Sequence, residues 1–194
     1  MSEETRKAIV DERLSKALTE NMWHNTMNTF LQLIATMNRT YKLPMNRMPG
    51  KDMNLSEQLQ NFKKILSDEI AEIDDIILNN EHASDIQAKM AAGNVDEIVL
   101  DAHVALADLL ADIVIYCFSE SLKHGIYLPA VLHNVMVSNF SKLGEDGQPI
   151  KDETGKFLKG PNYFPPEPAI KELLTMLWAD AVADEGRGDD GSTH

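Results

Sequence analysis

The chain has 194 residues, 43% hydrophobic and 25% charged, which is the composition of a globular protein with a sizeable core. Its 31 Asp and Glu residues outnumber its 18 Lys and Arg residues and give a formal net charge of −13, which argues against nucleic acid as a partner. A single cysteine, Cys117, excludes an internal disulfide, and the first residues lack the apolar stretch of a secretory signal. We therefore expect a cytoplasmic protein.

The first predicted elements are helical. Residues 4–18 are polar with weak periodicity and predict a fraying or docking helix. Residues 21–41 carry apolar side chains at helical spacing, and residues 42–54 contain two prolines and a glycine, which predicts a loop. We then expect a long helix that is capped by Ser56 and ends near residues 79–80.

The next predicted helix opens at residues 93–97 and ends near Lys123, with Gly125 behind it. Within it, residues 98–118 are apolar enough to be considered as a membrane span. They contain three Asp residues, each costing roughly 2.5–3.5 kcal/mol near the centre of a membrane helix. We therefore expect a buried helix of a soluble protein and no membrane partner.

The last third of the chain has a different composition, with more glycine and proline between its helices. A shorter helix is predicted over residues 128–142, followed at 143–168 by a stretch with four glycines and five prolines that predicts a loop or small hairpin. A final amphipathic helix is predicted over 169–182. The fold class is all-α, a bundle of four to five main helices in a single domain of residues 1–183, with a disordered tail at 184–194.

Two of the predicted helices carry acids where packing favours apolar residues. Glu69 falls on the apolar stripe of its helix, and Glu72 falls beside it. On the next helix, Asp101, Asp108 and Asp112 share one face, and residues 98–122 contain no Lys or Arg to pair with them. A hard divalent cation, Mg²⁺ or Mn²⁺, is the simplest partner for buried carboxylates. A solvated acidic groove and an oligomer interface are the alternatives that this pattern leaves open.

The stretches FLQLIATMNRTYKLP, ILSDEIAEI, LADLLADIVIYCFSESLKHGI and SNFSKLGEDGQPI…GKFLKGPNYFPPEP resemble the MazG-like all-α nucleoside triphosphate pyrophosphohydrolases. More narrowly, they resemble the phosphoribosyl-ATP pyrophosphohydrolase-like branch of bacteria and phages, over roughly residues 25–168. The resemblance implies Mg²⁺-dependent hydrolysis of a nucleoside or deoxynucleoside triphosphate to the monophosphate and pyrophosphate. It also implies a homodimer or homotetramer.

The metal motif of that family is ExxE on one helix and ExxD on the next. Glu69 and Glu72 match the first, and Asp112 matches the last acid of the second. The chain departs from the motif at Leu109, where the family has Glu, and Asp108 is our candidate to stand in as a metal ligand. Asp68 takes the place of an extra acid before ExxE. We expect Glu69 to act as the base that activates water, with Asp68 as the second candidate catalytic residue.

The resemblance also suggests substrate contacts. Asn139 and Lys142 are candidates for the phosphates and ribose, and Lys159 could close over the triphosphate. For the base, the candidates are Trp23 and Phe30, for which core packing is the alternative. Lys142 could equally serve as a cation at a helix C-terminus.

The base specificity stays open. In a phage, the substrate could be dGTP or another deoxynucleoside triphosphate, so that the enzyme controls the nucleotide pool. Two other functions also stay open at this point: a phosphoribosyl-ATP pyrophosphohydrolase, and a non-catalytic helical interaction protein with an acidic docking face.

Overall fold

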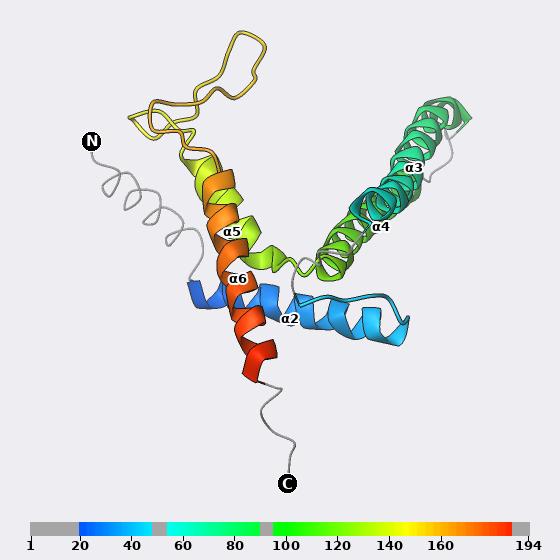
Figure 1. Cartoon of the computed structure of the whole chain (residues 1–194). Coiled ribbons are helices and arrows are strands. Elements are labelled where there is room, and N and C mark those ends of the chain that lie inside the picture. The colour runs from blue at the N-terminus through cyan, green and yellow to red at the C-terminus, as the bar shows by residue number, and fades with distance from the viewer. Residues whose placement is uncertain (1–19, 48–53, 90–94, 188–194) are drawn as a thin grey trace. The chain divides into compact units, whose positions relative to one another are not determined.

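The computed structural model describes residues 20–47, 54–89 and 95–187 (Figure 1). This part of the chain forms five α-helices and no strand, which confirms the all-α prediction. The helices are α2 (Glu20–Thr40), α3 (Leu55–Lys89), α4 (Val95–Lys123), α5 (Leu128–Phe140) and α6 (Glu167–Arg187). The helix predicted over residues 4–18 lies outside the described residues.

The chain divides into two compact units. One unit comprises residues 50–120, with α3 and most of α4. The other comprises residues 1–49 and 121–194, with α2, α5 and α6. In the second unit, α5 packs against both α2 and α6.

Helix α3 begins and ends at residues that differ from the prediction. Asn54, not Ser56, is the cap: its Oδ1 accepts the Glu57 backbone N–H at 3.3 Å, and its Nδ2 donates to the Glu57 carboxylate at 3.0 Å. The expected end near residues 79–80 is also wrong, since the helix continues to Lys89. Helix α3 contains no Gly or Pro, and an Asn costs at most about 0.7 kcal/mol relative to Ala, so Asn79 and Asn80 do not end the helix.

Helix α4 ends as the sequence predicts. After Lys123, Gly125 takes a positive φ of 65°, and the Ile126 backbone N–H reaches back to the Ser121 carbonyl at 2.8 Å. This is a C-terminal turn in which a residue with a Cβ would be strained.

The burial predicted for α4 is wrong. From Leu100 to Lys123 the helix is long and apolar enough to cross a membrane by length and composition alone. Only 17% of an 18-residue apolar stretch of this helix is buried within the structure. Five large apolar side chains on it are 41–61% exposed: Leu100, Val104, Leu106, Leu110 and Val114. This helix therefore carries an apolar face that its own unit leaves open.

The segment after α5 is tied back onto that helix. Helix α5 is two residues shorter than predicted, and Ser141 and Lys142 form a turn at its end. The Ser138 hydroxyl donates to the Phe164 carbonyl at 2.8 Å, and the Phe164 N–H donates to the Ser141 hydroxyl at 3.1 Å. Helix α6 starts at Glu167 and runs to Arg187, so residues 184–187, which the sequence placed in the tail, are helical.

Between α5 and α6 the predicted loop or small hairpin is a loop with one antiparallel bridge, between Lys151 and Phe157. Beside the bridge, the Leu158 N–H donates to the Ile150 carbonyl at 2.8 Å. Gly160 closes the loop: its N–H donates to the Lys142 carbonyl at 2.8 Å, and a Cβ there would lie 2.2 Å from the Leu143 carbonyl oxygen. Only glycine permits this approach of backbone to backbone.

Candidate functional site

Glu69 on α3 is a buried carboxyl group in the unit of residues 50–120. Its side chain is only 7% exposed, and its Oε2 atom is buried with no hydrogen-bond partner among the described residues. Leaving a buried carboxylate oxygen without a partner is costly, because its hydration is lost without replacement. The sequence pattern, which placed Glu69 on the apolar stripe of its helix, predicted this burial.

The charges that act on Glu69 are negative. Burial raises the pKa of the Glu69 carboxyl above its ordinary value, and the carboxylates of Glu72 and Asp112 raise it further. Asp68 adds a smaller effect in the same direction. Since Asp112 belongs to α4 and Glu69 to α3, acids from both helices face a common region.

Tyr116 completes this group and was not among the residues that the sequence singled out. Its hydroxyl hydrogen-bonds to the Glu69 carboxylate, which offsets part of the rise in the pKa of Glu69. Burial, followed by the charges of Asp112 and Glu69, raises the pKa of the Tyr116 hydroxyl, so it stays a donor. Its position four residues after Asp112, on the same helix face, is the signal that could have found it.

The remaining predicted acids take less buried positions. Asp112 is partly buried, whereas Glu72 and Asp68 are exposed. Asp101 and Asp108 are also exposed, so the expectation of a line of buried aspartates along α4 is wrong for these two. Leu109, at the position where the motif departs, is 2% exposed and packs as a core residue.

The donor chemistry of this group fits a hard cation. Glu69, Glu72 and Asp112 offer carboxylate oxygens only, the ligands that Mg²⁺ prefers, and one of these oxygens is buried without a partner. However, in the described residues no three His, Cys, Asp or Glu side chains stand close enough together to hold a metal ion.

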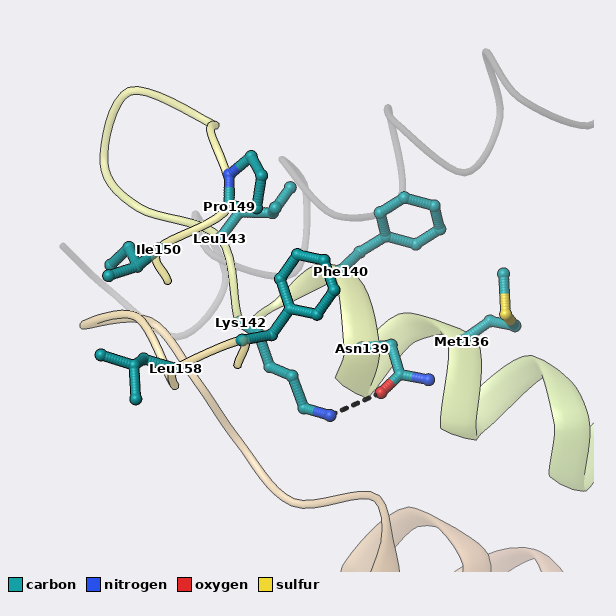
Figure 2. Close-up of a pocket in the computed structure, with 9 residues that line it drawn as sticks. Met136, Asn139, Phe140, Lys142, Leu143, Pro149, Ile150 and Leu158 are labelled. Carbon is teal, nitrogen blue, oxygen red and sulfur yellow. Dashed lines mark hydrogen bonds between the residues drawn. The ribbon is translucent and has the colours of Figure 1, made fainter. Parts of the chain in front are cut away.

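Two predicted substrate contacts meet in the other unit, at the C-terminal end of α5. The Lys142 ammonium donates to the Asn139 Oδ1 at 2.8 Å, as Figure 2 shows. Both residues line a pocket of about 300 Å³ between α5 and the loop that follows. The pocket is walled mainly by apolar side chains.

The other predicted contacts do not line this pocket. The Lys159 ammonium lies over the ring of Tyr163, 4.3 Å from its centroid. Phe30 is partly buried on α2, beside a shallow hollow with Asn25, Thr26, Thr29 and Leu33. The side chain of Trp23 lies outside the part of the chain whose side chains are described.

The chain is similar in structure to a protein described as a "putative NTP pyrophosphohydrolase" from Exiguobacterium sp. 255-15, with a TM-score of 0.41 and 19% sequence identity. The likeness covers 77% of this chain and 96% of the other. No protein-family model and no curated protein matches. A likeness this distant transfers neither a residue's role nor an activity.

Proposed function

We propose that the protein hydrolyses a nucleoside or deoxynucleoside triphosphate to the monophosphate and pyrophosphate, with Mg²⁺ held by Glu69, Glu72 and Asp112. The observation that carries the proposal is the buried Oε2 of Glu69, which has no hydrogen-bond partner within residues 20–47, 54–89 and 95–187 and lies near acids from two helices. A buried carboxylate with a perturbed pKa and no counter-charge costs stability, and such groups cluster at functional sites. The resemblance of the ILSDEIAEI and LADIVIYCF stretches to the pyrophosphohydrolases supports the same assignment.

Each acid has a role in this proposal. Mg²⁺ bound there would neutralise negative charge on the phosphate oxygens. Glu69 would accept a proton from the water molecule that attacks phosphorus. The new bond joins the water oxygen to the α-phosphorus, and the bond to the pyrophosphate oxygen breaks. Asp68, exposed next to Glu69, is the second candidate for the base.

The structure argues against Asp108 as a fourth metal ligand. Asp108 is exposed, and it is not among the charges that raise the pKa of Glu69. With Leu109 buried, α4 contributes Asp112 as its one acid near Glu69. We therefore assign three carboxylates to the cation and keep Asp108 as a residue to be tested.

The test is a screen of nucleoside and deoxynucleoside triphosphates, with phosphoribosyl-ATP included, in which release of pyrophosphate is measured with Mg²⁺. We expect at least one substrate to give pyrophosphate and the monophosphate. Glu69→Gln should lower turnover by about 10²–10⁴-fold, the usual contribution of a general base. Asp74→Asn, a neutralised exposed acid on the same helix, is the matched control. If the only products are orthophosphate and the nucleoside diphosphate, the proposed reaction is refuted.

We also propose that a second copy of this chain covers the apolar face of α4, in a homodimer or homotetramer. Five large apolar side chains of α4 are 41–61% exposed, and Ile70 and Ile77 of α3 are 58% and 48% exposed. An exposed apolar surface of this kind marks an interaction site. If no triphosphate is hydrolysed, this surface favours an interaction protein as the alternative.

A further inference from the structure

The pocket at the end of α5 is lined mainly by hydrocarbon. Its apolar side chains come from the helix, from the turn after it and from the loop, and include Met136, Phe140, Leu143, Ile150, Phe157 and Leu158. Its polar lining residues are Asn139 and Lys142, whose hydrogen bond Figure 2 shows. Among the lining residues that the structure describes, Lys142 is the one charged side chain, and none is acidic.

The loop side of the pocket is held by contacts within the loop itself. The Leu158 N–H donates to the Ile150 carbonyl at 2.8 Å. Between these residues the chain turns, and the Asp152 Oδ1 fixes the turn by accepting hydrogen bonds from the Thr154 hydroxyl and the Lys156 N–H. The apolar wall is therefore formed before any ligand binds, as in most small-molecule sites.

Three apolar side chains of this wall are exposed: Phe157 at 62%, Leu158 at 41% and Ile150 at 37%. A ligand that covered them would remove their surfaces from water, and removal of apolar surface from water favours binding. The wall therefore favours a ligand with a hydrocarbon group.

Lys142 and Asn139 suit an anionic group at one end of such a ligand. An ammonium has three N–H donors, and the hydrogen bond from Lys142 to the Asn139 Oδ1, at 2.8 Å, uses one of them. The same bond turns the amide oxygen of Asn139 toward the ammonium, so the amide N–H groups can donate to a ligand. A carboxylate has two accepting oxygens and a single negative charge, which matches one ammonium.

The lining also disfavours ligands with many polar groups. A nucleobase carries several donors and acceptors on its edge, and a peptide carries an N–H and a C=O group at almost every residue. Within the described lining, only Asn139 and Lys142 have polar side chains, and a polar group buried without a partner is costly. An alkyl chain carries no such group.

We propose that this pocket binds an unbranched aliphatic monocarboxylate, with its alkyl chain against Ile150, Phe157 and Leu158 and its carboxylate on Lys142 and Asn139. The inference assigns these two polar residues to a ligand other than the triphosphate expected from the sequence. It does not rest on the proposed function, because the pocket and the acids around Glu69 belong to different compact units.

The test follows the methyl signals of Met136, Ile150 and Leu158 by NMR in the full chain, with a chelator present. Butyrate, hexanoate and octanoate are titrated, and hexanol and hexylamine replace the carboxylate by other head groups. Each added methylene should strengthen binding about fourfold until the wall is covered, the fold-change expected from burial of one CH₂ group. Hexanol should bind more weakly than hexanoate, and hexylamine should bind most weakly of the three.

Two variants with matched controls separate the head group from the chain. Lys142→Met should abolish the preference for hexanoate over hexanol, whereas Lys171→Met, at an exposed lysine of α6, should preserve it. Phe157→Ala should weaken the binding of hexanoate and hexanol alike, because it removes part of the wall. Tyr41→Ala, which removes another exposed aromatic side chain, should leave both unchanged.

The inference is overturned if octanoate at millimolar concentration leaves the methyl signals in place, or if affinity does not rise with chain length. It is also overturned if Lys142→Met still prefers hexanoate to hexanol, or if Phe157→Ala binds both as Tyr41→Ala does. Two competitors complete the test: adenosine monophosphate and an acetylated tripeptide that ends in leucine. Tighter binding of either than of octanoate would make the pocket a nucleotide site or a peptide site and would refute the inference.

Discussion

Glu69 and Tyr116, 47 positions apart in the sequence, form a hydrogen bond between α3 and α4, and the Oε2 atom of Glu69 is buried with no hydrogen-bond partner in the part of the chain that the structure describes. The buried Oε2 is the atom that a proton or a cation would reach. Glu72 and Asp112 surround this carboxyl with negative charge.

The first prediction concerns pH. The pKa of Glu69 is raised in the folded protein, so over the window between its unfolded and folded values the folded state binds more protons than the unfolded state. Without divalent ions, wild type should therefore lose stability as pH rises through this window, and the full penalty should remain above the folded pKa. Glu69→Gln has no such penalty and should melt higher than wild type at neutral pH.

Thermal melting of both proteins across this pH range, with a chelator, measures the effect. Asp74→Asn on the same helix is the control and should follow the wild-type curve. A constant difference in melting temperature between wild type and Glu69→Gln at all pH values would contradict a raised pKa for Glu69.

The second prediction concerns Mg²⁺. If Glu69, Glu72 and Asp112 hold the ion, Mg²⁺ should stabilise wild type by RT ln(1 + [L]/Kd), about 2.7 kcal/mol at a hundredfold excess over Kd. Asp112→Asn should lose most of this stabilisation. Asp101→Asn and Asp108→Asn should keep it, because both side chains are exposed and neither raises the pKa of Glu69.

Melting curves of the four proteins with Mg²⁺ and with chelator decide between two ligand sets. A loss in Asp108→Asn equal to that in Asp112→Asn would restore Asp108 as a ligand. An equal Mg²⁺ shift in wild type and Asp112→Asn would remove the metal site, and with it the main physical support for the enzyme.

The third prediction concerns Tyr116→Phe, which deletes the hydroxyl and keeps the ring. A hydrogen bond to a charged group contributes about 1.5–3 kcal/mol, so the free energy of unfolding should fall by an amount of that order at neutral pH. In the background of Glu69→Gln the loss should be smaller, since the charge is absent. Chemical denaturation of the two single variants and the double variant gives the coupling energy; a coupling of zero would mean that the bond contributes nothing to stability.

Helix positions were largely predictable because each depends on local sequence. Gly125 marked the end of α4, and apolar spacing located α2 and placed Glu69 on a buried stripe. Ser56 failed as a cap because Asn54, two residues earlier, also has a side chain that can cap a helix.

The site was less predictable because it depends on which face of α4 meets α3. Residues 98–118 are apolar on most sides, so the sequence could not distinguish a buried face from an exposed one. Asp108 was placed inward and is exposed, whereas Leu109 is buried. Tyr116 was overlooked because a tyrosine in an apolar run is indistinguishable from core until its hydroxyl partner on another helix is known. Which of the acids bind metal stays a prediction.

The last prediction concerns self-association through α4. Val104 and Leu110 are 60% and 55% exposed on a helix whose apolar window is only 17% buried, and burial of apolar surface yields about 25 cal/mol per Å². Wild type should therefore sediment as a dimer or tetramer at micromolar concentration. Leu110→Lys should weaken the assembly by placing a charge in the contact, whereas Met176→Lys, an equally exposed apolar position on α6, should leave it intact. A wild-type monomer, or equal dissociation in both variants, would show that this face is not the contact between copies. Because both positions are exposed, neither lysine disturbs the interior of its own unit, and a change in sedimentation can be assigned to the surface that carries it.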